Sequence, residues 1–77
     1  MTARDRENLE KLDTLIRATP LALQENLRTQ YNLLIENWGD SQEKTRIILS
    51  MQDTLETSGL TDEDKLTLMQ AMEQVLF

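Results

Sequence analysis

The stretch Asn37–Lys44, NWGDSQEK, ends one helix and starts another near the middle of the chain. Gly39 suits the left-handed backbone position that often follows a helix. Asp40 and Glu43 match a variant of the capping box, in which side chains bind the free N–H groups of a helix start. Apolar residues recur at helical spacing on both sides of the stretch. It therefore predicts two helices joined by a tight turn.

Similar signals divide the rest of the chain. Pro20 disfavours helical geometry at Thr19 and fits the first position of a helix, so Thr19 is predicted to cap the second helix. One long helix kinked at Pro20 is the alternative. Gly59 closes a third helix, and Thr61 with Asp64 gives the start signal of a fourth. No stretch has strand periodicity. We predict an all-α protein, a small antiparallel bundle of three to four helices in one domain, with helices at about 3–18, 20–38, 41–57 and 62–76.

Each predicted helix carries an apolar stripe that should face a shared core. The second helix has few charges and a broad stripe, made of Leu23, Leu27, Tyr31, Leu34, Ile35 and Trp38, which predicts that it is the most enclosed of the four. Leu33 and Leu49 lie off their stripes. The residues most central to the stripes form the predicted core: Leu12, Ile16, Leu27, Leu34, Ile48, Met51, Leu55 and Met69.

The charge is acidic and unevenly distributed. The chain has 14 acidic and 8 basic residues, a net charge of −6. Residues 1–46 are nearly neutral, whereas residues 47–77 carry six acids against Lys65 alone. Such a surface repels phosphates and anionic membranes and favours basic partners. The alternative is that the acids only keep a small protein in solution.

Several kinds of chemistry find no support in the sequence. There is no Cys and no His, which excludes disulfides and thiolate metal sites. No serine lies in a recognisable catalytic motif. A calcium loop aligned on Gly59 would have Thr54 first and Lys65 twelfth, where carboxylate ligands are required. A helix that begins Asp-Glu-Asp has the wrong sign for DNA contact. We therefore expect no enzyme activity, no cofactor, no metal and no direct nucleic-acid binding.

The N-terminus and the hydropathy bear on localisation. The first ten residues are charged and lack the apolar core of a signal peptide. No apolar run approaches the roughly 18 residues that a membrane span needs. We expect a cytoplasmic protein without a membrane partner.

The last 19 residues, GLTDEDKLTLMQAMEQVLF, raise a question about a second chain. The three acids are explained by the helix start, where free N–H groups and the helix dipole favour carboxylates. The apolar residues that follow cover a wider arc than one small core can hide. We expect a two-sided helix, with Leu66, Met69 and Met72 on the side opposite to the partner. The expected partner-binding residues are Leu49, Leu68, Val75, Leu76, Phe77, Asp62 and Glu63.

The functional hypothesis is a non-enzymatic protein-binding module, such as a small inhibitor, chaperone or adaptor, that occupies the surface of a partner protein. The partner would carry basic residues at its rim, and a homodimer is the simplest version. One alternative is an acidic mimic of nucleic acid, although three of the six C-terminal acids cluster on a single turn. Another is a purely structural homo-oligomer.

Overall fold

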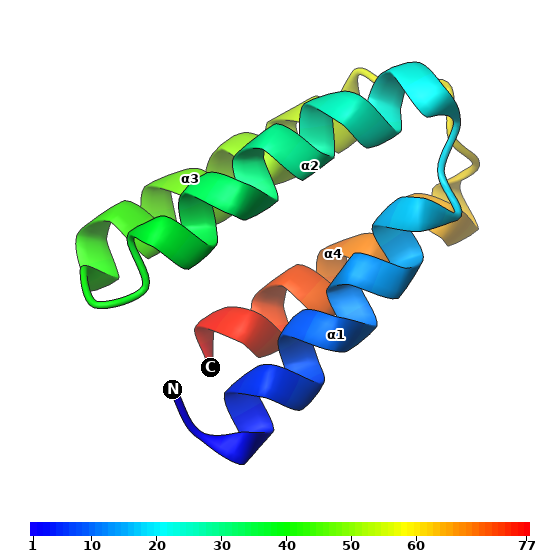
Figure 1. Ribbon diagram of the computed structural model, residues 1–77. Coiled ribbons are helices and arrows are strands. Elements are labelled where there is room, and N and C mark those ends of the chain that lie inside the picture. The colour runs from blue at the N-terminus through cyan, green and yellow to red at the C-terminus, as the bar shows by residue number, and fades with distance from the viewer.

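The computed structural model describes all 77 residues, and it contains four α-helices and no strand. Each helix packs against two neighbours, so the four form a ring in which α1 lies beside α2 and α4, and α3 lies beside the same two (Figure 1). Both termini lie at one end. The all-α bundle predicted from the sequence is confirmed. Its helices are α1 (Ala3–Arg17), α2 (Leu21–Glu36), α3 (Ser41–Glu56) and α4 (Asp62–Leu76).

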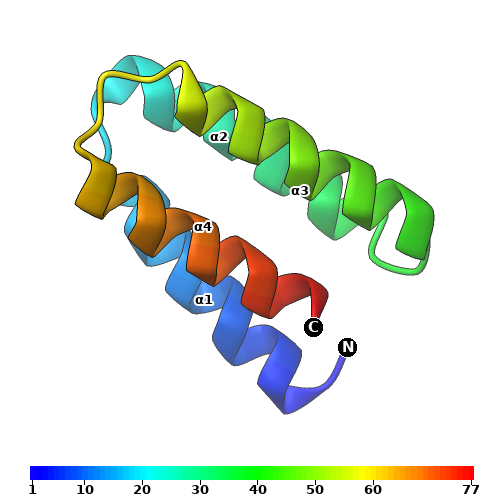
Figure 2. The ribbon, with the colours of Figure 1, turned by 180° about the vertical axis from the view of Figure 1, so that it is seen from behind.

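The bundle consists of two helix pairs that diverge toward one end. In both views, α1 lies with α4 and α2 lies with α3, and the pairs separate from the α1–α2 and α3–α4 connections toward the termini and the α2–α3 turn (Figures 1 and 2). Packing is most extensive between α1 and α4 and least extensive between α1 and α2. The seam between α1 and α2 is therefore the least covered part of the core.

Three of the helices start on a side-chain cap, which satisfies N–H groups that have no partner within the helix. Thr2 and Asp5 form a complete capping box, with the Thr2 backbone N–H 2.9 Å from the Asp5 carboxylate. This hydrogen bond lowers the pKa of Asp5 below its ordinary value. Asp40 accepts from two N–H groups of α3, and the Thr61 hydroxyl accepts from the Asp64 N–H.

Two details of the turns differ from the sequence-based prediction. The second helix begins at Leu21 with Pro20 in the capping position, and the Thr19 hydroxyl instead donates to the Ile16 carbonyl at 2.6 Å. The Thr19 side chain is thus used to close α1. Gly39 does not adopt a left-handed conformation, since no residue of the chain has a positive φ. The Asp40 N–H donates to the Asn37 carbonyl, which closes the turn without it.

The core confirms most of the predicted residues. Seven of the eight are fully buried: Leu12, Ile16, Leu27, Leu34, Ile48, Met51 and Leu55. The exception is Met69, which is only partly buried, whereas Met72 takes the central position with no exposed surface. The buried side of α4 consists of Leu68, Ala71, Met72 and Val75, at i, i+3, i+4 and i+7.

The prediction that α2 is the most enclosed helix is wrong. It contributes only Leu27 and Leu34 to the buried residues, whereas α3 and α4 contribute four residues each. Leu21 is 70% exposed and Leu33 is 43% exposed. The low charge of α2 reflects uncharged amides on its solvent side rather than burial, so it did not indicate a central position.

Polar contacts tie α1 to α2 across their open seam. The Tyr31 hydroxyl donates to the Leu9 carbonyl at 3.2 Å, and Arg28 forms an ion pair with Asp13, which also pairs with Arg17. Partial burial raises the pKa of Tyr31 above its ordinary value, and the negative charge of Asp13 adds a smaller effect in the same direction. These contacts fix the position of α1 where apolar packing is least extensive.

Replacing Tyr31 with phenylalanine tests the value of this hydrogen bond. The ring stays in place and the Leu9 carbonyl loses the hydrogen bond from the Tyr31 hydroxyl, so the free energy of unfolding should fall by ~0.5–1.5 kcal/mol. Urea denaturation followed by circular dichroism measures the difference. Thr29→Val is the matched control, because it removes an exposed hydroxyl that bonds only within α2. A loss no larger than that of the control would show that the bond does not stabilise the seam.

Candidate protein-binding surfaces

Polar contacts identify which side of α4 faces which neighbour. The Lys65 ammonium donates to the Glu56 carbonyl at 3.4 Å, so this side faces α3. Gln74 accepts from Asn8 and Lys11, so the opposite side faces α1. Residues at i+4 and i+11 from Lys65 follow the α3 side along the helix. They are Met69 and Leu76, both partly buried against the core.

A surface that we call the α3–α4 face combines these residues with two exposed leucines. Leu49 of α3 is 55% exposed, and Leu66 of α4 is 57% exposed. Thr54, which accepts from Gln30 of α2, marks the side of α3 that faces α2, and helical spacing places Leu49 far from it. The two helices lie in front when the molecule is seen from behind (Figure 2). The apolar part of the α3–α4 face is thus Leu49, Leu66, Met69 and Leu76.

Four carboxylates border the α3–α4 face. On α4, Asp62 lies four residues before Leu66, and Glu73 lies four residues after Met69. On α3, Asp53 lies four residues after Leu49, and Glu56 lies seven residues after it. All four are exposed. None takes part in an ion pair, since the three ion pairs of the chain involve only Asp13 and Glu43 as acids. These carboxylates therefore border the apolar residues with negative charge that no ion pair neutralises, while Arg46 lies beside Leu49.

The structure separates the residues that the sequence predicted to bind a partner. Leu49, Leu76 and Asp62 share the α3–α4 face. Leu68 and Val75 are 3% and 4% exposed, so their assignment to a free surface is wrong. Met72 is buried as expected, but Leu66 and Leu68 were assigned to the wrong sides of α4, because Ala71 is small and was not counted in the stripe that also contains Leu68, Met72 and Val75.

The remaining two predicted residues lie at opposite ends of α4, and both are exposed. Phe77 is 91% exposed and lines a shallow hollow with Arg4 of α1 and with Glu73. It follows Leu66 at i+11, so it borders the α3–α4 face at the C-terminal end of α4. Glu63 lies one turn before Thr67, which is on the α1 side, so Glu63 lies away from this face.

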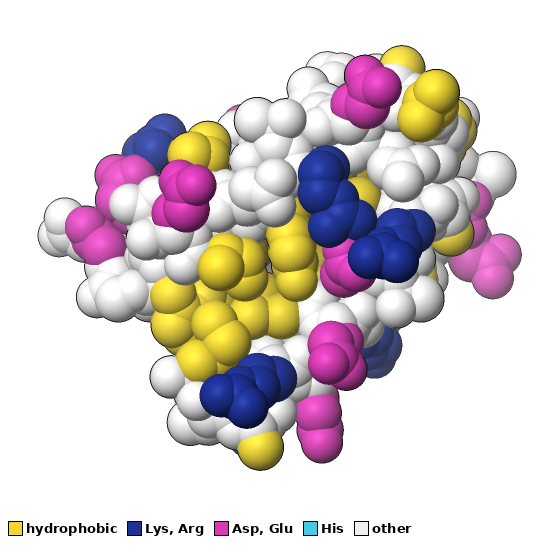
Figure 3. Space-filling model, in the orientation of Figure 1, with side chains coloured by type: hydrophobic (Ala, Val, Ile, Leu, Met, Phe, Trp, Pro, Cys, Tyr) yellow, Lys and Arg dark blue, Asp and Glu magenta, His cyan; other side chains and the backbone are white.

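A second exposed apolar surface lies in the seam between α1 and α2. Ile35 is 38% exposed, and Tyr31 and Trp38 are partly buried against the core. Apolar side chains gather along this seam where the pairs diverge, next to charged side chains (Figure 3). Lys44 lies over the Trp38 ring, 4.0 Å from its centroid, a cation–π contact that joins the α2–α3 turn to α3. The sequence placed these residues in a core stripe, and no sequence signal showed that α1 would leave them uncovered.

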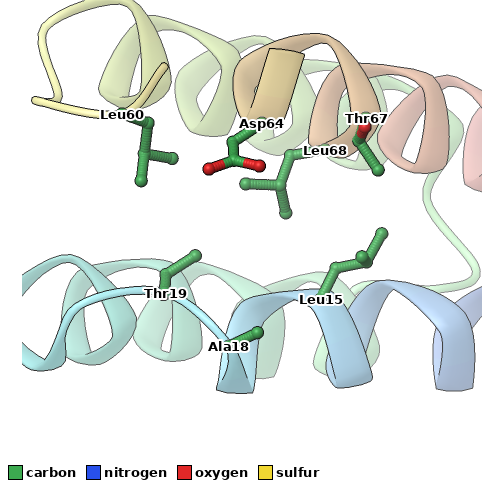
Figure 4. A pocket seen from close by; sticks show the side chains of 7 residues that line it. All are labelled: Leu15, Ala18, Thr19, Leu60, Asp64, Thr67 and Leu68. Carbon is green, nitrogen blue, oxygen red and sulfur yellow. The ribbon is translucent and has the colours of Figure 1, made fainter. Parts of the chain in front are cut away.

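A small hollow lies where the end of α1 meets the start of α4 (Figure 4). Its volume is about 110 Å³, well below the roughly 300–1,000 Å³ of small-molecule sites. Its polar residues are Thr19, Asp64 and Thr67, and the other walls include Leu15, Leu60 and Leu68. The hollow is a gap in packing between the ends of two helices, too small for most ligands.

Comparison with known proteins adds no relative. No protein-family model, curated protein or solved structure matches the chain. None of the four helices is both long and apolar enough to cross a membrane. No three acidic side chains lie close enough together to hold a metal ion. Any proposal about function therefore depends on the surfaces of the bundle itself.

Proposed function

We propose that the protein is a non-enzymatic protein-binding module that occupies the surface of a partner protein through the α3–α4 face. The observation that carries this proposal is the pair of leucines, Leu49 and Leu66, each more than half exposed on neighbouring helices. Folding does not require these two leucines, because other residues of α3 and α4 form the core. Exposed apolar area rimmed by polar residues commonly marks an interaction site.

Helix packing gives the mode of binding. Met69 and Leu76 contribute further apolar surface along the same side of α4, so the face extends along the helix rather than being a single point. Apolar residues on two neighbouring helices offer a surface against which a third apolar helix can pack. The α3–α4 face thus supports an inhibitor, chaperone or adaptor that covers a helical segment of its partner.

The alternative of a nucleic-acid mimic is less well supported. A mimic needs carboxylates distributed over one surface in place of an apolar centre, and here Asp62 and Glu63 lie on different sides of α4. The α3–α4 face has leucines where a mimic would need charge. The protein-binding proposal accounts for both its apolar and its acidic residues.

A differential capture experiment tests the proposal. The immobilised protein is compared with a Leu49→Ser, Leu66→Ser variant and with a Leu21→Ser, Leu33→Ser control, which removes exposed leucines from α2. We expect specific proteins to be retained by the wild type and the control and lost from the face variant. Circular dichroism shows whether all three are folded.

Two results would contradict the proposal. Retention of the same proteins by both variants would show that the α3–α4 face does not bind them. If sedimentation shows that the wild type self-associates and that only the face variant is monomeric, while nothing is captured, the face is a structural contact between identical chains.

A further inference from the structure

The charges around the α3–α4 face identify the chemistry of its occupant. Asp53, Glu56, Asp62 and Glu73 border the apolar residues, and none is neutralised within the chain. We infer that the face binds a basic amphipathic helix of another protein, with its apolar stripe on Leu49, Leu66, Met69 and Leu76 and its Lys or Arg side chains beside the carboxylates. This inference rests on the proposed function and names its partner class.

The basic residues near the face leave this negative charge available. Lys65 is the only basic residue of α4, and its ammonium is directed to the backbone carbonyl of Glu56. Arg46 of α3 forms an ion pair with Glu43 at 2.6 Å, which lowers the pKa of Glu43 through their hydrogen bond. Arg4 of α1 lines a hollow beside Glu73. None of these three cations forms an ion pair with a carboxylate of the face. A basic partner therefore meets charges that are not already in ion pairs.

The same charges disfavour a second copy of the chain as the occupant. A symmetric dimer through this face would place the same acids of both protomers around one interface. Like charges in contact oppose association, whereas opposite charges steer it and select the partner. The homodimer expected from the sequence is thus less favourable here than a complex with a basic helix.

The length of the face suits a helix of several turns. Asp62, Leu66, Met69, Glu73 and Leu76 follow one another at i, i+4, i+7, i+11 and i+14, which spans nearly the whole of α4. At about 1.5 Å per residue, this stripe is roughly 20 Å long. A partner helix that lies along it can contact Leu66, Met69 and Leu76 and also reach the carboxylates of Asp62 and Glu73.

Designed peptides test the inference directly. The first has leucines at helical spacing with lysines on both flanks, the second has glutamates in place of the lysines, and the third is a scrambled form of the first. Fluorescence anisotropy measures the binding of each labelled peptide to the full-length protein. We expect the lysine peptide to bind more tightly than both others, and added salt to weaken its binding.

Matched variants locate the binding site. Asp62→Asn with Glu73→Gln removes two charges from the face and leaves its shape, and should weaken binding of the lysine peptide roughly threefold to tenfold. Glu25→Gln with Glu36→Gln removes two exposed charges from α2 and should change the affinity less than twofold. Nuclear magnetic resonance should show shifts at the Leu49 and Leu66 methyl groups.

The possible results separate the inference from the proposed function. Equal binding of the lysine and glutamate peptides, equal effects of the two charge variants, or shifts confined to Tyr31, Ile35 and Trp38 would overturn the inference. A dimer in sedimentation that depends on the α3–α4 face would also overturn it. If proteins are still captured through Leu49 and Leu66 in that case, the proposed function stands and only the basic helix is wrong.

Discussion

Replacing Leu27 with alanine should lower the free energy of unfolding by ~2–5 kcal/mol, the largest effect that we expect from a substitution in α2. Leu27 has no exposed surface, and the structure relaxes only partly around the cavity that alanine leaves. Small domains are stable by only about 5–15 kcal/mol, so this loss is a large part of the total. Urea denaturation monitored by circular dichroism measures it.

Leu33→Ala is the matched control for this substitution. It makes the same chemical change in the same helix, but Leu33 is 43% exposed and outside the core. Helix propensity changes little between leucine and alanine. We expect Leu33→Ala to cost less than about 1 kcal/mol. If Leu27→Ala cost no more than this control, the face of α2 that meets the core would be wrongly placed.

Leu68→Ala and Leu66→Ala should have opposite outcomes, although the two residues are separated by only one position. Leu68 is 3% exposed and packs in the core, so its truncation should cost ~2–5 kcal/mol. Leu66 is 57% exposed, and its truncation should change the free energy of unfolding by about 0.5 kcal/mol or less. The same pair of substitutions should have the reverse order of effects on partner capture, provided that Leu68→Ala remains folded.

This pair tests the orientation of α4, on which the proposed function depends. Urea denaturation gives the two stabilities, and proton exchange of the α4 amide groups reports whether the helix persists in each variant. If Leu66→Ala lowered the free energy of unfolding more than Leu68→Ala, Leu66 would face the core, as the apolar pattern alone suggested. The α3–α4 face would then lose Leu66, one of the two leucines that define it.

The sequence by itself determined the fold class and the positions of the turns. Helical spacing of apolar residues identified all four helices, and Pro20, Gly39 and Gly59 lie in the connections between them. These signals are local, because caps, breakers and periodicity act within a few residues of the backbone they control. The sequence also predicted the central core residues, because a residue in the middle of a clear apolar stripe, such as Leu12 or Ile48, has to face the core.

Only the tertiary structure decided which side of α4 is buried and how far α2 is enclosed. The apolar residues of α4 surround much of the helix, so periodicity did not distinguish the side of Leu68 from the side of Leu66. In the folded protein Ala71 is buried together with Leu68, Met72 and Val75, so this side of α4 faces the core. The exposure of Ile35 likewise depends on the divergence of α1 from α2. Contacts between helices fix both features, and no stretch of a single helix encodes them alone.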